Sequence, residues 1–169
     1  MDYARRHPTE AASSRAFLGF AASGPDVYSR GRADGHFTAS CWLVSGNRER
    51  VLLTHHRKLG RWLQLGGHAD DDSDLAGVCL REAQEESGLV GLVVEPQIFD
   101  IDAHTIPARA ADPEHIHWDV RFVVHCRASE QWQLSEESLA LAWVTIAALA
   151  ADPAADESLK RMAQKWLAR

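Results

Sequence analysis

The chain has 169 residues, of which 46% are apolar and 25% are charged, a composition typical of a single globular domain with a substantial core. Its 18 basic and 24 acidic side chains leave a formal net charge of -6, which disfavours binding to nucleic acid polymers and to anionic membranes. Cys41, Cys79 and Cys126 form no paired motif, so we expect reduced, buried cysteines and a cytoplasmic location. We expect neither a secretion signal nor a membrane span, because no apolar stretch is long enough.

The distribution of apolar, polar and turn-forming residues predicts an N-terminal extension followed by a main domain. Residues 1–35 are expected to form an extension, with a disordered start, a short amphipathic helix over residues 9–22 and then a loop. The main domain is expected over residues 36–169. It begins with strands over residues 37–45 and 50–55, which flank a turn-like Ser-Gly-Asn sequence and predict a hairpin. A third short strand over residues 62–65 ends at two glycines.

Apolar residues at helical spacing predict a helix from Leu75 to a stop at Gly88, capped by Asp72, Ser73 or Asp74. Further strands are expected over residues 92–101, 116–126 and 141–145, with a polar connection over residues 103–115. A final helix is predicted over residues 156–168. Because strands and helices alternate irregularly, we expect an α/β fold with a mixed sheet covered by helices.

The predicted central helix carries an unusual group of charges. Glu82, Glu85 and Glu86 are spaced i, i+3 and i+4, so three carboxylates share one helix face and repel each other by roughly a few tenths of a kcal/mol per pair. A divalent cation would turn this repulsion into attraction, and oxygen ligands suit Mg²⁺ or Mn²⁺. Arg81 is expected to orient Glu85 from four residues away. The alternative is a solvated acidic helix face.

The stretch from Gly67 to Leu89, GHADDDSDLAGVCLREAQEESGL, resembles the Nudix box, G-x5-E-x7-R-E-U-x-E-E-x-G-U with U aliphatic. Every fixed position agrees except one, where Ser73 replaces the first glutamate. The preceding strands, the sequence WLQLGG at residues 62–67 and the late strand AWVTI also look like that family. The resemblance therefore covers roughly residues 36–150.

The resemblance implies a Nudix-like α/β/α sandwich with a central mixed β-sheet, and hydrolysis of a diphosphate linked to another group with Mg²⁺ or Mn²⁺. By the same resemblance Glu82, Glu85 and Glu86 bind metal with help from the Gly66 carbonyl, and Arg81 supports them. The aspartates at positions 70, 71, 72 and 74 are close enough to substitute for the missing glutamate. A helix-capping role for this acidic loop is the alternative.

Other residues are candidates for binding or chemistry. On the strand from residue 115, alternation places His117 and Arg121 on one polar face, from which Arg121 could grip a phosphate. Arg57 and Arg61, close in sequence to the two glycines, and His68 beside them are further substrate-binding candidates. Each of these residues has a solvent-exposed or purely structural alternative. Glu136 or Glu137, before the last strand, is a candidate additional base.

Our leading interpretation is a Nudix-type pyrophosphohydrolase, a divalent-metal-dependent enzyme that cleaves a phosphoanhydride bond in a small molecule. The expected substrate is a nucleoside diphosphate linked to another group. One alternative is an enzyme like isopentenyl-diphosphate isomerase, which needs a cysteine at its site. The other is a Nudix-like ligand-binding module with weak catalysis, for which Ser73 is the only indication. The sequence leaves open the exact substrate and whether the protein forms a homodimer.

Overall fold

The computed structural model describes residues 2–109 and 113–169. Its helices are α1 (Asp2–Arg6), α2 (Ala11–Ala21), α3 (Leu75–Ser87), α4 (Ile146–Ala151) and α5 (Glu157–Leu167), with 3-10 turns at Pro8–Glu10 and Pro25–Tyr28. Its strands are β1 (Gly35–Val44), β2 (Arg50–His56), β3 (Arg61–Leu63), β4 (Leu65–His68), β5 (Leu92–Ile106), β6 (His115–Cys126) and β7 (Ser138–Thr145). The start of the chain was expected to be disordered, and α1 shows that this expectation was wrong.

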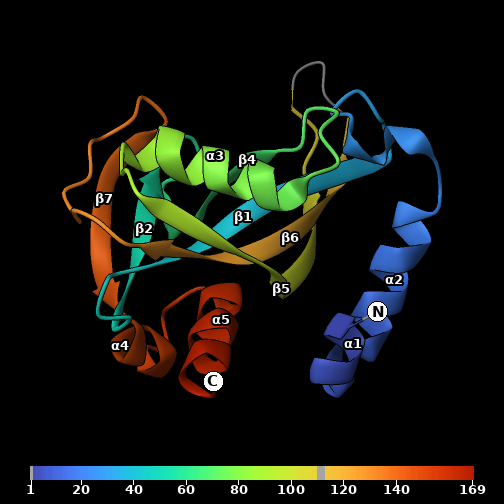
Figure 1. The fold of residues 1–169 in the computed structure, drawn as a ribbon. Coiled ribbons are helices and arrows are strands. Elements are labelled where there is room, and N and C mark those ends of the chain that lie inside the picture. Colours follow the sequence, from blue (N-terminus) through green and yellow to red (C-terminus); the bar gives the residue numbers. More distant parts are fainter. Residues whose placement is uncertain (1, 110–112) are drawn as a thin grey trace.

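The strands form one mixed sheet between helices. The central order is β3-β2-β1-β6-β5, with β4 paired to β1 and β7 paired to β2. The pairing of β1 with β6 is parallel, whereas β1 meets β2 and β4 in antiparallel fashion. The helix α3 lies on one side of the sheet, and α4 and α5 lie on the other (Figure 1). The predicted α/β fold with a central mixed sheet is confirmed.

The predicted hairpin between β1 and β2 is wrong in its extent. The two strands pair at Val44 and Val51 beside the turn, and then they separate. Away from the turn, β1 pairs with β6 and β4, and β2 pairs with β7 and β3. In place of the single strand predicted over residues 62–65 there are two short strands. The strand β3 pairs with β2, and β4 pairs with β1. This arrangement places Gly66 and Gly67 directly against β1.

The helix α3 begins and ends where its sequence predicts. Of the three candidate caps, Asp74 is the one used, because its Oδ1 accepts a hydrogen bond from the Gly77 amide at 3.1 Å. Gly88 ends the helix in a left-handed conformation, with φ of 66°, as glycine does readily. The buried positions Val78, Cys79 and Ala83 pack on the sheet, and the helix edge beside β4 carries Glu82 and Glu86.

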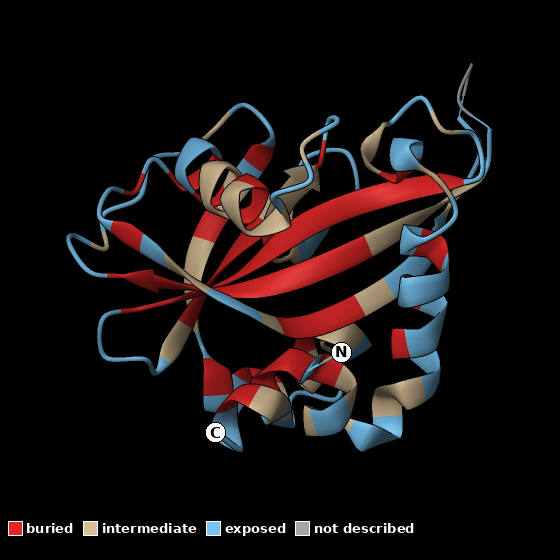
Figure 2. Cartoon of the chain, turned by 45° about the vertical axis from the view of Figure 1, so that its right-hand side comes forward, coloured by how far each residue is buried: buried red, intermediate tan, exposed pale blue. Residues whose placement is uncertain are grey.

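The core is divided between the two faces of the sheet, and the residues on the central strands are buried (Figure 2). On the face of α3, the N-terminal extension adds aromatic side chains to the core. The ring of Phe20 stacks on Trp118 with centroids 4.6 Å apart, and Phe17 meets the same indole edge-on at 5.1 Å. The extension thus packs on the main sheet.

The strands β5 and β6 are longer than predicted. Their antiparallel pairing continues to Ile106 and His115, so residues 103–106 and 115 of the predicted connection belong to strands. Residues 110–112 of that connection lie outside the described part of the chain. The short helix α4, which directly precedes α5, was not predicted. All three cysteines are free and buried, as expected.

Among residues 2–109 and 113–169, no helix has both the length and the apolar character that crossing a membrane requires.

Candidate active site

A cleft of about 580 Å³ opens beside α3 and the glycines of β4. Its walls come from β1, β4, β6, α3 and several loops, so residues far apart in the sequence meet there. The cleft is lined with charges of both signs. Its acidic residues are Asp70, Glu82, Glu85, Asp119 and Glu137, and its basic residues are Arg30, Lys58, Arg81 and Arg109.

The three glutamates of α3 have different environments. Glu85 is exposed, Glu82 is half-buried and Glu86 is only 6% exposed. Burial raises the pKa of Glu86 to about 8, against the opposing effect of a hydrogen bond from the Gly66 amide at 2.7 Å. Burial and the neighbouring charge of Glu85 raise the pKa of Glu82. Within the described residues, no cation forms an ion pair with any of the three carboxylates, which leaves their charge for an external cation.

The donor set suits Mg²⁺ or Mn²⁺. Carboxylates grouped on one helix edge beside exposed backbone are the hard oxygen ligands that these ions prefer. Burial is the main cause of the raised pKa values of Glu82 and Glu86, and neighbouring carboxylates add to both; a divalent cation would oppose both effects. The residues present therefore fit the ion that the sequence predicts.

The two glycines before α3 are required by close packing. A Cβ atom at Gly67 would overlap the carboxylate of Glu82, and one at Gly66 would overlap Ser40 and the Ala39 carbonyl of β1. Gly66 also has φ of 155°, a backbone conformation that other residues rarely adopt. The sequence Gly66-Gly67 thus brings the strand backbone into contact with the acids of α3.

Arg81 does not orient Glu85 as predicted. Its Nη1 instead lies 3.6 Å from Oδ2 of Asp72, which ties the loop before α3 to the middle of the helix. Arg81 still lines the cleft. Asp72 therefore supplies a carboxylate partner for Arg81 from the position next to Ser73.

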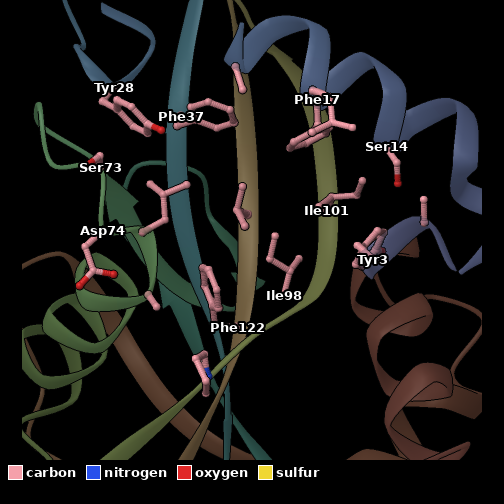
Figure 3. A pocket seen from close by; sticks show the side chains of 17 residues that line it. Tyr3, Ser14, Phe17, Tyr28, Phe37, Ser73, Asp74, Ile98, Ile101 and Phe122 are labelled. Carbon is pink, nitrogen blue, oxygen red and sulfur yellow. The ribbon is translucent and has the colours of Figure 1, made fainter. Parts of the chain in front are cut away.

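Ser73 itself lies against a different cavity. This cavity, of about 400 Å³, lies between α3 and the N-terminal helices, and it is mostly apolar. Figure 3 shows Ser73 and Asp74 on one side of it, opposite Phe17 and Tyr3. The position where the Nudix box has its first glutamate is thus directed away from the cleft that holds Glu82 and Glu85.

The predicted substrate-binding residues are only partly brought together. His68 and His117 line the cleft, whereas Arg57 and Arg61 do not. The guanidinium of Arg57 donates to the backbone carbonyls of Glu136 and Ser138 at 2.8 and 3.1 Å, so it holds the entry to β7. Arg61 lies 3.7 Å from Asp156 at the start of α5. Neither arginine is placed to meet a ligand in the cleft.

Arg121 lies in the interior and not on an open polar face. Its side chain is 2% exposed and forms ion pairs with Asp119 at 2.7 Å, Asp100 at 3.1 Å and Asp102 at 3.3 Å. The helix α5 covers this part of the sheet, and Arg161 from that helix pairs with the same Asp100 at 2.7 Å. The strand alternation was correct, but the face is covered, so Arg121 cannot reach a phosphate.

The structure distinguishes the two candidate bases before β7. Glu137 lines the cleft, whereas Glu136 does not. The charge of Glu137 is a smaller contribution to the raised pKa of both Glu82 and Glu86.

Several cleft residues could not be identified from the sequence. Arg30 comes from the loop before β1, and its Nε and Nη2 donate to the two carboxylate oxygens of Asp70 at 2.5 and 2.6 Å. Lys58, His104 and Arg109 also line the cleft. The only signal in the sequence was the cationic stretch around Lys58, because the loop and the extended β5 carry no motif.

The NUDIX domain profile matches residues 35–165 of the chain. The chain belongs to the Nudix hydrolase family. The predicted assignment to this family and to its pyrophosphohydrolases is thereby confirmed. A search of curated proteins found no match.

Solved structures of this family share the fold at low sequence identity. The Escherichia coli dihydroneopterin triphosphate pyrophosphohydrolase is 18% identical with a TM-score of 0.65, over 85% of this chain and 99% of that one. A C. elegans Ap4A hydrolase complex is 15% identical with a TM-score of 0.60, over 78% and 95%. A NUDIX family hydrolase from Clostridium perfringens is 24% identical with a TM-score of 0.55, over 79% and 97%.

Proposed function

We propose that this Nudix protein uses Mg²⁺ or Mn²⁺ to hydrolyse a phosphoanhydride bond in a small molecule, namely a nucleoside diphosphate linked to another group. The observation that carries the proposal is the set of three carboxylates on α3, which have no cationic partner in the described structure. Glu82 and Glu85 line the cleft, and Glu86 lies beside them against the Gly66 amide. Two similar folds are named for the hydrolysis of Ap4A and of dihydroneopterin triphosphate, which supports a phosphoanhydride of a small molecule as the bond cleaved.

The cation would be held by the three glutamates of α3, which differ in their burial and share one helix edge: Glu82, Glu85 and Glu86. Such a cation screens the charge of the diphosphate and stabilises the leaving phosphate oxygen. The amide of Gly66 fixes one oxygen of Glu86 at 2.7 Å, so that carboxylate is held in place before any ligand arrives. Arg81, held by Asp72, would support the same helix turn without contacting the substrate.

Positive residues on the cleft walls would bind the outer phosphates. Lys58 and Arg109 line the cleft and form no ion pair with another described residue, so their charges are available to an anion. Arg30 is already engaged by Asp70. His68 and His117 would contact the group attached to the diphosphate or one of its phosphates, since both border the same space.

Glu137 is the residue that we assign as general base. It is exposed, it lines the cleft, and its charge acts on Glu82 and Glu86. A carboxylate of the cleft that lies outside α3 can accept a proton from a water molecule without giving up a metal-binding group. Glu136, which lies outside the cleft, has no such role.

The isomerase alternative is disfavoured by the cysteines. Cys41 and Cys79 are fully buried and Cys126 is 1% exposed. None of the three lines the cleft, whereas that chemistry needs a cysteine beside the substrate. The alternative of a binding module with weak catalysis predicts diphosphate binding with little turnover.

The test is a substrate screen with the full-length protein. Nucleoside triphosphates, dinucleoside polyphosphates, sugar nucleotides and coenzymes would be incubated with Mg²⁺ or Mn²⁺, while phosphate and pyrophosphate release is measured. The proposal expects metal-dependent turnover of at least one nucleoside diphosphate derivative, abolished by a chelator and by Glu85→Gln. The matched control is Glu157→Gln, at an exposed helix position that pairs only with Lys160. Binding without turnover across the panel would favour the ligand-binding module.

A further inference from the structure

A group of histidines lies on one face of the sheet, apart from the carboxylates of α3. His36 on β1 and His117 on β6 are direct neighbours in the parallel pairing of these strands, and His115 precedes His117 by two residues on the same face. One ring nitrogen from each of the three lies within 4.8 Å of the others. The ring of His68 on β4 is a further neighbour, 5.1 Å from His36 and 5.0 Å from His117.

His36 has no internal partner for its polar atoms. Its side chain is 2% exposed, and within the described residues neither Nδ1 nor Nε2 makes a hydrogen bond. The Arg32 carbonyl lies near enough to favour the charged ring slightly, but it does not reach hydrogen-bonding geometry. A buried polar group without a hydrogen-bond partner destabilises the fold. Among residues 2–109 and 113–169, nothing completes the hydrogen bonding of this imidazole, so its position suits an external ligand.

The hydrogen bonding of His115 is that of a metal ligand. Nδ1 of His115 lies 2.9 Å from the Pro113 carbonyl. Donation of its proton to that carbonyl leaves the lone pair on Nε2, an arrangement that commonly orients a ligand histidine.

We propose that His36, His115 and His117 form a binding site for a divalent transition-metal cation of the Zn²⁺ type, separate from the carboxylates of α3. Neutral imidazoles suit Zn²⁺ and Co²⁺, whereas Mg²⁺ requires oxygen ligands. Zn–N bonds of about 2.1 Å place tetrahedral ligand atoms about 3.4 Å apart, so the rings need to move inward by little more than 1 Å. Three protein ligands leave a fourth position, which water or His68 can fill.

The site has an approach from solvent. A cavity of about 340 Å³ is lined by His36, His68 and His115, together with Arg30 and Pro113. His68 and His117 also line the cleft beside α3. An ion bound by the histidines would therefore lie in the wall shared by the two spaces, with access from the smaller cavity.

The test uses the full-length protein in an excess of Mg²⁺, which saturates oxygen-ligand sites. Zn²⁺ would be titrated against a chromophoric chelator, and Co²⁺ would be followed by its d–d absorption, which reports nitrogen ligation and low coordination number. We expect one Zn²⁺ per chain for the wild type. His115→Gln and His117→Gln should each weaken Zn²⁺ binding by roughly 100-fold or more, since each removes a direct ligand.

Two control variants separate binding at the histidines from binding elsewhere on the protein. His55→Gln changes a partly buried histidine of β2 outside the cluster, and Glu85→Gln changes a carboxylate of α3; both should retain the Zn²⁺ affinity of the wild type. Circular dichroism and cooperative unfolding establish that each variant is folded. Absence of Zn²⁺ binding by the wild type, or equal binding by both cluster variants, would overturn the proposal. Loss of binding in Glu85→Gln alone would place the ion at the carboxylates and would also overturn it.

A measurement on the wild type covers the case in which the cluster variants unfold. Ring nitrogen resonances of the histidines would be followed by NMR during the Zn²⁺ titration. The site predicts saturating shifts for His36, His115 and His117 and none for His55. Shifts spread over the surface histidines, without change at His36, would contradict it.

Discussion

The Gly66 amide donates a hydrogen bond of 2.7 Å to Oε1 of Glu86, across the junction between β4 and α3. This contact joins the backbone of a glycine to the most deeply buried carboxylate of the α3 group. It explains why glycine and glutamate occur together here, because the strand must approach the helix closely while the carboxylate stays in place. The predictions below follow from this junction and its surroundings.

Glu85→Gln should lower turnover by orders of magnitude and leave the free energy of unfolding nearly unchanged. Glu85 is exposed, so its contribution is a charge directed at the cation and not packing. Steady-state kinetics at several Mn²⁺ concentrations, combined with urea denaturation, would measure both effects. Turnover like that of the wild type would show that Glu85 is a solvated surface charge.

Without divalent metal, the protein should lose stability as the pH rises. The pKa of Glu86 is raised from 4.5 to about 8 in the folded state, so the folded state binds the proton more tightly than the unfolded chain. The stability linked to this proton is complete below pH 4.5 and is lost as the pH passes about 8, with a size on the order of a few kcal/mol. Urea denaturation with a chelator at a series of pH values would show the decline. Glu86→Gln should remove it, and Mn²⁺ should restore stability at alkaline pH.

Gly67→Ala should reduce turnover sharply, because the added Cβ would overlap the Glu82 carboxylate. The matched control is Gly19→Ala in α2, where a Cβ meets no atom within 4 Å and alanine should stabilise the helix by roughly 0.5 to 1 kcal/mol. Kinetics and thermal unfolding of both variants would make the comparison. Equal activity of Gly67→Ala and the wild type would mean that Glu82 can move without loss.

Ser73→Glu should not raise turnover, because Ser73 lies against the apolar cavity and Asp72 already contacts Arg81 at 3.6 Å. Asp72→Asn should lower turnover instead, since it removes the charged partner that fixes Arg81. Measuring kcat and KM for both variants would decide between the two positions. A large gain from Ser73→Glu would show that the departure from the Nudix box is a true deficiency.

Arg121→Met should destabilise the fold and leave substrate affinity unchanged in the fraction that folds. Removing this cation leaves the buried carboxylates of Asp100 and Asp119 without one of their partners, at a cost of roughly 3 to 5 kcal/mol. Chemical denaturation would measure the loss, and KM would report on binding. A raised KM with unchanged stability would restore the phosphate-binding interpretation.

The contrast between α3 and Arg121 shows what the sequence could predict. The limits of α3 follow from local chemistry, because Asp74 and Gly88 cap the helix and its apolar positions recur every turn. The face of β6 that carries Arg121 also follows from alternation. The covering of that face does not, because it depends on Asp100 of β5 and on α5, which are distant in sequence.

The same limit applies to the hairpin and to the cleft. The turn after β1 is local and is present, but the pairing of β1 with β6 and β4 is set by the whole sheet. Arg30 enters the cleft from a loop without a motif, so no spacing could identify it. The sequence thus indicated the carboxylates of α3 as candidates, but it did not indicate Arg30 or Arg109, which also line the cleft.

The central claim is that the carboxylates of α3 bind divalent cations, and anomalous diffraction from crystals soaked in Mn²⁺ tests it most directly. With a non-hydrolysable diphosphate compound present, the account predicts an anomalous peak within bonding distance of Glu82, Glu85 and Glu86. Well-diffracting crystals that contain the bound diphosphate and show no such peak would contradict it.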